Sequence, residues 1–270
     1  MHDAWYMTTA TIANQVSVFP VRIRAKEFRL SVRFREGGND LVLFVHGLGC
    51  SKESWRAAWQ RPELRCRSLL APDLPGFGHS ECPPGFTPDL VHYAEVLRAL
   101  IDAYALRRIH LVAHSMGGSI ALLLPSPVLS RLESLVLVEP RLFGPSCGVA
   151  TMAVGVSREE FRRSVFPAIR QRMSADPRAV FDLNRADINA FYAGSRSLME
   201  WSADRALLER FEQADCRKFF IYGADNRHLK ELDFVEPALT IAIEDAAHFV
   251  MNDNPDGFYA CLQNILDNPG

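Results

Sequence analysis

Residues 109–124, IHLVAHSMGGSIALLL, contain the change of pattern that decides the fold of this chain. Residues 109–113 are apolar except for His110, which is typical of a short strand covered on both faces. Residues 117–124 have the composition of a buried helix, which ends before Pro125 because proline cannot continue the helical hydrogen bonds. A covered strand that passes directly into a helix predicts a strand–helix unit of a parallel sheet.

Ser115 lies where the strand passes into the helix, and the small residues Ala113, Gly117 and Gly118 surround it. A serine at such a sharp turn has a strained backbone. It needs small neighbours that let strand and helix approach each other, and the turn exposes its Oγ. The pattern differs from G-x-S-x-G by Ala113 in place of the first glycine. We interpret it as a nucleophile elbow, in preference to a serine that only caps a helix.

Further segments predict the other strands of the sheet. Two strands joined tightly are expected at residues 18–24 and 28–34, and shorter strands at residues 41–45, 67–71, 134–138, 218–222 and 239–243. Residues 89–105 and 255–266 carry apolar side chains at helical spacing and predict helices. Alternation of this kind predicts a mostly parallel sheet flanked by helices, with an opening pair of strands that can be antiparallel.

The alternation stops between residues 142 and 215. Residues 157–173 and 187–211 have helical patterns there, and no buried strand interrupts them. We therefore expect one α/β core made of residues 1–141 and 216–270, with a helical cap inserted at residues 142–215.

The charge balance argues against nucleic acid as a partner. Thirty Lys and Arg oppose 32 Asp and Glu, the net charge is −2, and the sequence has no basic block. The longest apolar runs are far shorter than the roughly 18 residues of a membrane span, so no membrane association is expected. We expect a small-molecule substrate as the partner and leave the oligomeric state open.

The six cysteines are scattered singly, without C-x-x-C pairs or metal-ligand spacing. Free thiols in a reducing compartment, no metal and no other cofactor are therefore expected. The start of the chain lacks the basic and apolar regions of a secretory signal. We expect a cytoplasmic protein with a flexible first dozen residues.

Together with the elbow, three segments give the chain a resemblance to the α/β-hydrolase superfamily over nearly its whole length. Residues 46–49, HGLG, resemble the oxyanion segment of that family, and residues 73–80, DLPGFGHS, resemble its D-x-x-G-x-G-x-S loop. Ala247-His248-Phe249, ahead of the last helix, resembles the segment of the catalytic histidine. The resemblance implies an α/β-hydrolase fold with a mostly parallel eight-stranded sheet and an inserted helical cap.

The resemblance also implies a role for each of several residues. Ser115 is implied as the nucleophile and His248 as the general base. The backbone N–H groups of Leu48 and Met116 are implied as the oxyanion hole, since a tetrahedral intermediate needs preorganised donors. The side chains expected around the substrate are His46, Phe166, Phe191, Trp201 and Phe249.

The acid that pairs with the histidine has two candidates. Most members of the family carry it in a G-x-x-D pattern after the strand that follows the insertion. Here the glycine of that pattern is Gly223, Asn226 takes the acid position and Asp225 comes one residue early. Some members, including certain dehalogenases, place the acid at the end of the strand before the insertion, where Glu139 fits without a shift. An amide cannot stabilise an imidazolium as a carboxylate does, so we favour Glu139 and keep Asp225 as the alternative.

A serine nucleophile with a histidine base forms an acyl-enzyme from an ester, a thioester or a lactone, and water then releases the acid. The resemblance therefore implies a serine hydrolase, and the first expectation is hydrolysis of a carboxylic ester of a small to medium apolar substrate. Hydrolysis of carbon–carbon bonds, or an aminopeptidase activity, would use the same triad and stays open. A ligand-binding or receptor protein with little turnover is a further alternative, which the intact Ser115 and His248 disfavour.

Overall fold

The computed structural model describes residues 15–23 and 26–268. The expectation of a flexible start concerns the first dozen residues, which lie outside this range. The centre of the molecule is an eight-stranded sheet with the order β1-β2-β4-β3-β5-β6-β7-β8. The strands are β1 (Gln15–Ile23), β2 (Lys26–Arg35), β3 (Asp40–Val45), β4 (Ser68–Pro72), β5 (Arg108–His114), β6 (Leu132–Val138), β7 (Lys218–Gly223) and β8 (Thr240–Ile243).

The pairings of the sheet are parallel from β4 to β8. β1 pairs with β2, and β2 with β4, in the antiparallel direction. The prediction of a mostly parallel sheet with an antiparallel opening pair is thereby confirmed. β5 lies between β3 and β6 in the middle of the sheet. Ser115 therefore follows a central strand, at the edge where the carboxyl ends of the parallel strands meet.

Alternate residues of the central strands face two separate apolar layers. In β3, Leu41, Leu43 and Val45 face one layer, and Val42 and Phe44 face the other. The first layer contains α1 (Leu90–Ala103), α2 (Met116–Leu122), α3 (Ser126–Leu129) and α8 (Ala206–Gln213), and the second contains η1 (Lys52–Gln60), α9 (Val250–Asp253) and α10 (Pro255–Asp267). Because both faces are covered, the strands appear in the sequence as continuous apolar runs.

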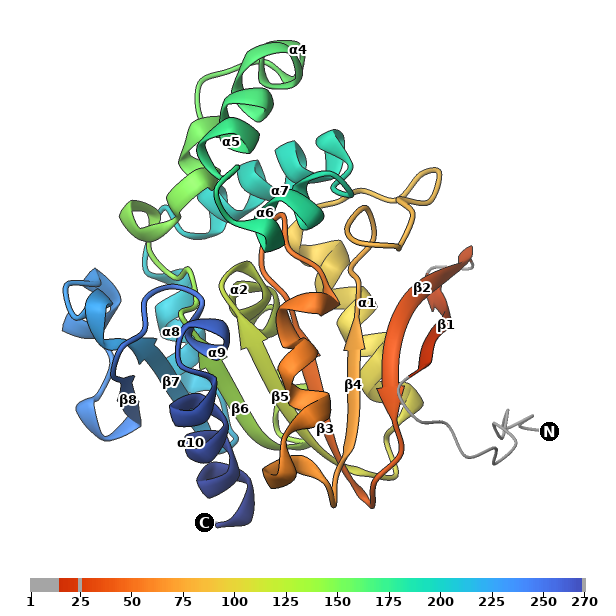
Figure 1. Ribbon diagram of the computed structural model, residues 1–270, viewed down its shortest axis with the longest axis vertical. Helices are drawn as coiled ribbons and strands as arrows, with labels where there is room; N and C mark the ends of the chain where they lie inside the picture. The colour runs from red at the N-terminus through yellow and green to blue at the C-terminus, as the bar shows by residue number, and fades with distance from the viewer. Residues whose placement is uncertain (1–14, 24–25, 269–270) are drawn as a thin grey trace.

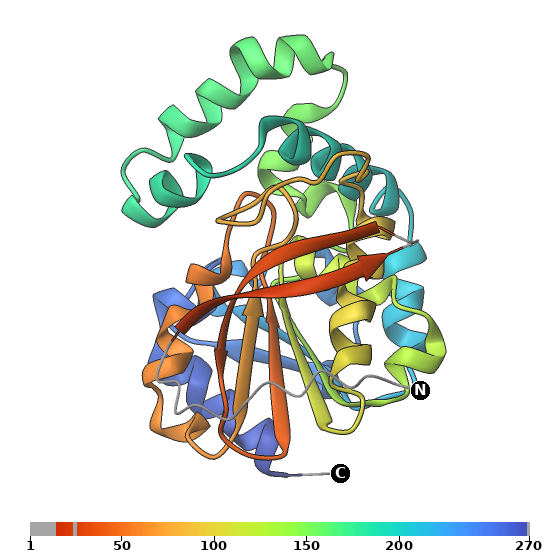
Figure 2. The same cartoon turned by 90° about the vertical axis from the view of Figure 1, so that its right-hand side faces the viewer.

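A helical segment between β6 and β7 lies above the carboxyl ends of the strands, as Figures 1 and 2 show from two sides. Its helices are α4 (Arg158–Glu160), the π-helical turn η5 (Phe161–Val165), α5 (Phe166–Arg172), α6 (Pro177–Leu183) and α7 (Ile188–Trp201). α4, η5 and α5 follow one another without a break and together occupy the helix expected at residues 157–173. This segment covers the edge of the sheet where Ser115 lies.

The single helix expected at residues 187–211 is divided in two. α7 ends at Trp201, and α8 begins at Ala206 and packs against α2 beside the sheet. Asp204 separates them, and its side chain accepts the N–H of Ala206 at 2.9 Å. α8 therefore belongs to a helical layer of the sheet, so the part of the insertion that lies above the sheet ends with α7, before residue 215.

Short helical turns complete the chain. They are η2 (Pro62–Leu64), η3 (Gly144–Ser146), η4 (Gly148–Ala153), η6 (Ala224–Asn226), η7 (Lys230–Asp233) and η8 (Pro237–Leu239). Among the helices of the described residues, none combines the length and the apolar surface that crossing a membrane requires.

Candidate active site

Ser115 occupies a left-handed turn between β5 and α2, with φ 54° and ψ −122°. Its N–H donates to the carbonyl of Val138 at 2.9 Å, which ties the turn to β6. Such a backbone costs a residue with a side chain on the order of 1–3 kcal/mol, and it persists where the surrounding structure fixes it. Ser115 also lines a cavity, so the strained turn presents this serine to a space where a ligand fits.

Glycines let the elements around Ser115 approach closely. A Cβ at Gly47 would lie 2.9 Å from the Cβ of Ser115, and a Cβ at Gly117 would lie 2.7 Å from the carbonyl oxygen of His46. Both distances are too short for side chains, so the loop after β3 and the start of α2 pack against the serine only because these residues are glycine. The small residues seen in the sequence thus have a steric reason.

Leu48 follows Gly47, which packs against Ser115, and Met116 follows Ser115 in the chain. The backbone N–H groups of Leu48 and Met116 have no acceptor among the described residues. Met116 is the first residue of α2, where an N–H has no acceptor within the helix. His46 holds the loop of Leu48: the N–H of Leu74 donates to its Nε2 at 2.9 Å, and its Nδ1 donates to the Gly47 carbonyl at 2.8 Å. Burial lowers the pKa of His46, so the ring is neutral, in agreement with these bonds.

Glu139 follows β6 in a left-handed conformation, with φ 47°, and is fully buried. Its Oε1 accepts the N–H of Gly223 at 2.9 Å and the side-chain amide of Asn226 at 3.1 Å. Its Oε2 lies 3.4 Å from Nδ1 of His248. Asn226 therefore orients Glu139 toward the histidine.

Asp225, the alternative acid, is exposed. Its backbone N–H donates to the carbonyl of Ala246 at 3.1 Å, and within the described residues no hydrogen bond joins its carboxylate to His248. The structure brings Glu139 to the histidine and leaves Asp225 at the surface.

His248 lies in the loop before α9, and its side chain is partly exposed. Its ring contacts those of His114 and Phe249, with centroids 4.6 and 5.1 Å away, and Nε2 of His114 donates to its carbonyl at 2.9 Å. Burial, together with the charge of Arg141, lowers the pKa of His248 well below its usual range. The ring is therefore neutral. Within the described residues, no hydrogen bond joins it to Ser115.

Arg141 is a residue of this site that the sequence analysis missed. Its Nη2 lies 2.6 Å from Nδ1 of His248, and its Nη1 lies 3.7 Å from Oε2 of Glu139. Burial lowers the pKa of Arg141, and the negative charge of Glu139 opposes this change. Arg141 lies two residues after Glu139, and this closeness to an acid candidate was the only signal for it in the sequence.

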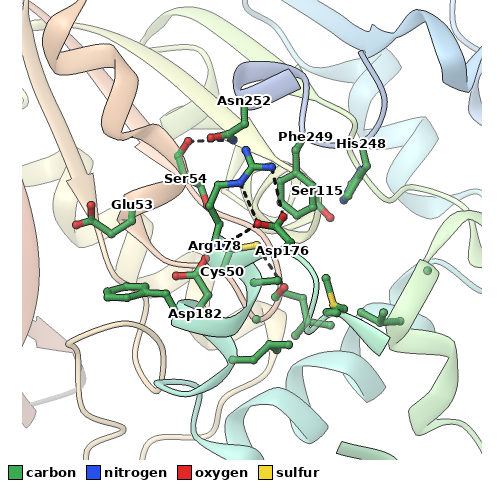
Figure 3. A pocket seen from close by; sticks show the side chains of 18 of the residues that line it. Cys50, Glu53, Ser54, Ser115, Asp176, Arg178, Asp182, His248, Phe249 and Asn252 are labelled. Carbon is green, nitrogen blue, oxygen red and sulfur yellow. Dashed lines mark hydrogen bonds and ion pairs between the residues drawn. The ribbon is translucent and has the colours of Figure 1, made fainter. Parts of the chain in front are cut away.

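A cavity of about 770 Å³ contains Ser115 and His248, and helices of the segment above the sheet form its other wall. Figure 3 shows both side chains beside Asp176, Arg178 and Asp182, which come from the segment of α6. The larger apolar side chains of the lining are Leu48, Val149, Met173, Phe181, Leu183, Phe191, Leu198 and Phe249. A concave, mostly apolar space with a few polar groups is typical of a small-molecule site.

Two of the five expected pocket residues, Phe191 and Phe249, line this cavity. His46 and Phe166 are buried elsewhere: His46 holds the loop after β3, and the ring of Phe166 packs on that of Phe191 at 5.3 Å. The guanidinium carbon of Arg210 in α8 lies over the ring of Trp201, 5.6 Å from the ring centroid. These three side chains fill the packing between elements, which the sequence does not distinguish from a cavity wall.

One bond ties α6 to the core beside this cavity. The hydroxyl of Ser51 donates to Oδ1 of Asp182 at 2.5 Å. Burial, with the negative charges of Asp73 and Glu53, raises the pKa of Asp182 to about 6. Because Ser51 comes three residues after Leu48, this bond connects the helical segment to the loop that carries a candidate oxyanion donor.

In the described part of the chain, no group of three or more His, Cys, Asp or Glu side chains is arranged to hold a metal ion. The six cysteines are free thiols. Cys50 lines the cavity, and burial raises its pKa, so it is a neutral thiol and a weak nucleophile. Ser115 is therefore the better-placed nucleophile of the two.

Comparison with known sequences gives a family and partial relatives. The family model described as "Alpha/beta hydrolase family" matches residues 42–260. The chain is 35% identical over 105 residues to 2-hydroxy-6-oxo-2,4-heptadienoate hydrolase of Pseudomonas putida. This matched region is 38% of this chain and 38% of that protein. The chain is 32% identical over 133 residues to the dihydrolipoyllysine-residue acetyltransferase component of the acetoin cleaving system of Cupriavidus necator, which covers 49% of this chain and 35% of that protein. These matches span little more than a third of each relative's length.

Solved structures resemble the chain over most of its length. A mutant of the N-acyl homoserine lactonase AidH, complexed with N-hexanoyl homoserine, has a TM-score of 0.74 at 17% identity and covers 94% of this chain and 98% of that chain. A thermophilic esterase from Thermogutta terrifontis, with malate bound, has a TM-score of 0.73 at 22% identity and also covers 94% and 98%. At these identities, the likeness shows that the fold is shared.

Proposed function

This chain belongs to the alpha/beta hydrolase family, and from that premise we propose that it is a serine hydrolase that cleaves a carboxylic ester through an acyl-enzyme. The family prediction made from the elbow and the loops is confirmed. The observation that supports the proposed activity most directly is the left-handed backbone of Ser115 at the end of β5. A strained serine that lines a cavity together with a histidine suits nucleophilic attack better than packing.

In the proposed reaction, Ser115 Oγ attacks the ester carbonyl carbon while Nε2 of His248 takes the hydroxyl proton. The N–H groups of Leu48 and Met116 receive the negative charge that develops on the carbonyl oxygen. The intermediate then expels the alcohol, which takes the proton from His248. A water molecule that loses its proton to His248 finally releases the acid from Ser115.

We propose Glu139 as the acid of the triad. Its Oε1 is held by Gly223 and Asn226, which leaves Oε2 free to accept a hydrogen bond from a protonated Nδ1 of His248. A carboxylate fixed in this way holds the imidazole in the tautomer that leaves Nε2 free, and it stabilises the imidazolium that forms during attack.

The cavity supports a small to medium apolar substrate. Its volume of about 770 Å³ lies within the range of sites for drug-sized molecules. Leu48 of the core and Phe191 and Leu198 of the segment above the sheet give apolar walls to the cavity that Ser115 also lines. We therefore expect short and medium acyl chains to be better substrates than long ones.

Hydrolysis of 4-nitrophenyl esters from acetate to dodecanoate by the wild-type protein tests this proposal, with Ser115→Ala as the control. We expect turnover with an optimum at short to medium chains and a loss on the order of 10³-fold or more in Ser115→Ala, because the nucleophile is gone. Equal rates for the two proteins would contradict a serine hydrolase.

A second candidate is hydrolysis of a carbon–carbon bond, which the 35% identity to 2-hydroxy-6-oxo-2,4-heptadienoate hydrolase favours. The compound in that enzyme's name, 2-hydroxy-6-oxo-2,4-heptadienoate, can be offered to the wild-type protein and to Ser115→Ala. A rate through Ser115 that exceeds the rates on all esters would replace the esterase assignment.

A further inference from the structure

Arg141 is a buried cation in the candidate active site that the proposed reaction does not use. It is 9% exposed and lines the same cavity as Ser115. Its guanidinium lies 2.6 Å from Nδ1 of His248 and 3.7 Å from Oε2 of Glu139. It therefore contacts both residues on which the basicity of the site depends.

The contact between Arg141 and His248 has a fixed direction. A guanidinium offers only N–H donors, so Nδ1 of His248 must be the acceptor. A neutral imidazole that accepts at Nδ1 carries its proton on Nε2. In this state Nε2 cannot take a proton from Ser115, and Nδ1, 3.4 Å from Oε2 of Glu139, has no N–H to donate to that carboxylate. The observed arrangement is therefore a resting state of the base.

Burial and the charge of Arg141 lower the pKa of His248. The ring is consequently not doubly protonated near neutral pH, and it is held in the resting tautomer. In a serine protease, the wrong histidine tautomer lowers kcat by on the order of 10⁴. A productive state requires that Arg141 leave Nδ1.

Most of the donor capacity of Arg141 is unused. In the described residues, only its Nη2 makes a hydrogen bond, and the acceptor is a neutral ring. The nearby carboxylate of Glu139 is already bonded through Oε1 to Gly223 and Asn226. A buried guanidinium with free donors at a cavity wall suits a carboxylate, which accepts two parallel N–H bonds.

We propose that Arg141 is a specificity-determining residue that binds a carboxylate carried by the ester substrate, and that this binding draws its guanidinium away from Nδ1 of His248. The inference rests on the proposed serine hydrolase function and adds to its substrate an anionic group that binds Arg141, while the apolar part of the substrate contacts the apolar walls of the cavity. Once Arg141 turns to the substrate, Nδ1 takes up a proton from solvent and donates it in a hydrogen bond to Oε2 of Glu139, while Nε2 releases its proton to solvent. The number of protons on the ring does not change.

Two esters of matched length test the proposal: 4-nitrophenyl hydrogen glutarate, which carries a carboxylate, and 4-nitrophenyl methyl glutarate, which does not. kcat/KM is measured for the wild type, Arg141→Met and Arg56→Met. Arg56 also lines the cavity but is exposed, so its variant removes the same charge without touching His248. We expect the ratio of the two kcat/KM values, acid over neutral ester, to fall about tenfold or more in Arg141→Met. In Arg56→Met we expect a change of less than about twofold. An unchanged ratio in Arg141→Met, or an equal fall in Arg56→Met, overturns the proposal.

The pH profile on the neutral ester separates this role from a structural one. His248 faces Glu139 and Arg141 from the segment after β6, and His114 from β5. Removal of the cation raises the pKa of His248, so the acid limb of kcat/KM moves to higher pH in Arg141→Met. A limb that stays in place while the whole profile falls would show that Arg141 only supports the fold.

Nitrogen NMR of histidine-labelled protein distinguishes this inference from the proposed function. The signals of His248, identified with His248→Gln, are recorded with butyrate and with butyramide. We expect butyrate to move the ring proton from Nε2 to Nδ1, and we expect no effect from butyramide or in Arg141→Met. If butyrate has this effect and no ester is hydrolysed, the anion site stands and the esterase assignment fails. If Ser115-dependent hydrolysis occurs and butyrate has no effect, the anion site fails alone.

Discussion

Glu139 and Asn226 show how a site is defined by the partners of single side chains. Both come from loops at the carboxyl ends of neighbouring strands, and the amide donates to the carboxylate at 3.1 Å. In the sequence, Asn226 only weakened the case for an acid after β7. In the structure, it has a role of its own, because it keeps Oε1 of Glu139 occupied and leaves Oε2 for His248.

We expect the substitutions Glu139→Gln and Asp225→Asn to have different effects on kcat. Loss of the buried carboxylate removes the charge that stabilises the imidazolium, so we expect kcat on a 4-nitrophenyl ester to fall by about 10²–10⁴-fold. Asp225 is exposed, so its variant should stay within about twofold of the wild type. Steady-state kinetics on both variants decide between them. A large loss in Asp225→Asn alone would assign the acid to the other loop.

Ser115, His248 and Glu139 could be proposed from the sequence because each lies in a local pattern at the end of a predicted element. Arg141 could not be proposed in this way, because its guanidinium contacts a ring 107 residues further along the chain. No local pattern encodes such a contact, since an arginine after a strand is most often solvated.

Among the elements, α6 was not predicted from the sequence. It has seven residues, too few for a clear apolar repeat, and it begins with Pro177 after the capping residue Asp176, whose side chain accepts the N–H of Arg178 at 2.9 Å. Its contribution to the site comes from its end, where Asp182 accepts the Ser51 hydroxyl. α6 therefore connects the helical segment to the loop of Leu48.

Asp182 makes this connection sensitive to pH. Its pKa is raised from 3.8 to about 6 in the folded protein, so the protonated form is favoured by folding. The stability that this provides is present below about pH 4 and is lost as the pH rises through about 6. We expect the free energy of unfolding of Asp182→Asn, relative to wild type, to rise by up to ~3 kcal/mol between pH 4 and pH 8.

Chemical denaturation at pH 4, 6 and 8 measures this difference. Asp176→Asn on the same helix is the control, because its carboxylate is more exposed and asparagine caps a helix equally well. A difference for Asp182→Asn that is the same at all three pH values would show that its carboxylate titrates normally.

Boundaries of elements were the least predictable part of the fold. The apolar spacing of residues 187–211 is continuous, yet the chain turns after Trp201 so that α8 packs against α2. Apolar side chains on both sides of the turn are buried in either case. Which layer buries them depends on tertiary packing, and a periodic pattern does not contain that information.

Across the whole molecule, the central strands could be predicted from uninterrupted apolar runs, because helices cover both faces of the sheet there. The buried polar links between distant segments were not predicted. Lys52 and Asp73 are both fully buried and form an ion pair at 2.5 Å. Lys52 also donates to Ser31 Oγ at 3.0 Å, and Asp73 accepts the N–H of His79 at 2.8 Å. The pair thus joins β2, the start of η1 and the loop after β4.

Asp73→Ala should destabilise the folded state strongly, because it leaves the charge of Lys52 buried without a partner. We expect a loss of about 3–5 kcal/mol in the free energy of unfolding. Asp256→Ala breaks the exposed pair between Arg61 and Asp256 and should cost no more than about 1 kcal/mol. Urea denaturation of both variants compares the two. Similar losses would mean that the buried pair adds nothing beyond a surface pair.

The inserted helical segment leaves the sheet after β6 and returns to it at β7, its parallel neighbour. Glu139 bonds to Gly223 and Asn226 across this gap, so the two ends of the insertion are fastened to each other beneath it. An exchange of the insertion would keep this fastening at its base, and a new segment would have to replace contacts such as the bond from Ser51 to Asp182. Recombination between relatives at these two points would replace one wall of the cavity and would keep the proposed nucleophile, base and acid unchanged. New substrate specificities would then arise by exchange of the helical segment, while the proposed catalytic residues stay the same.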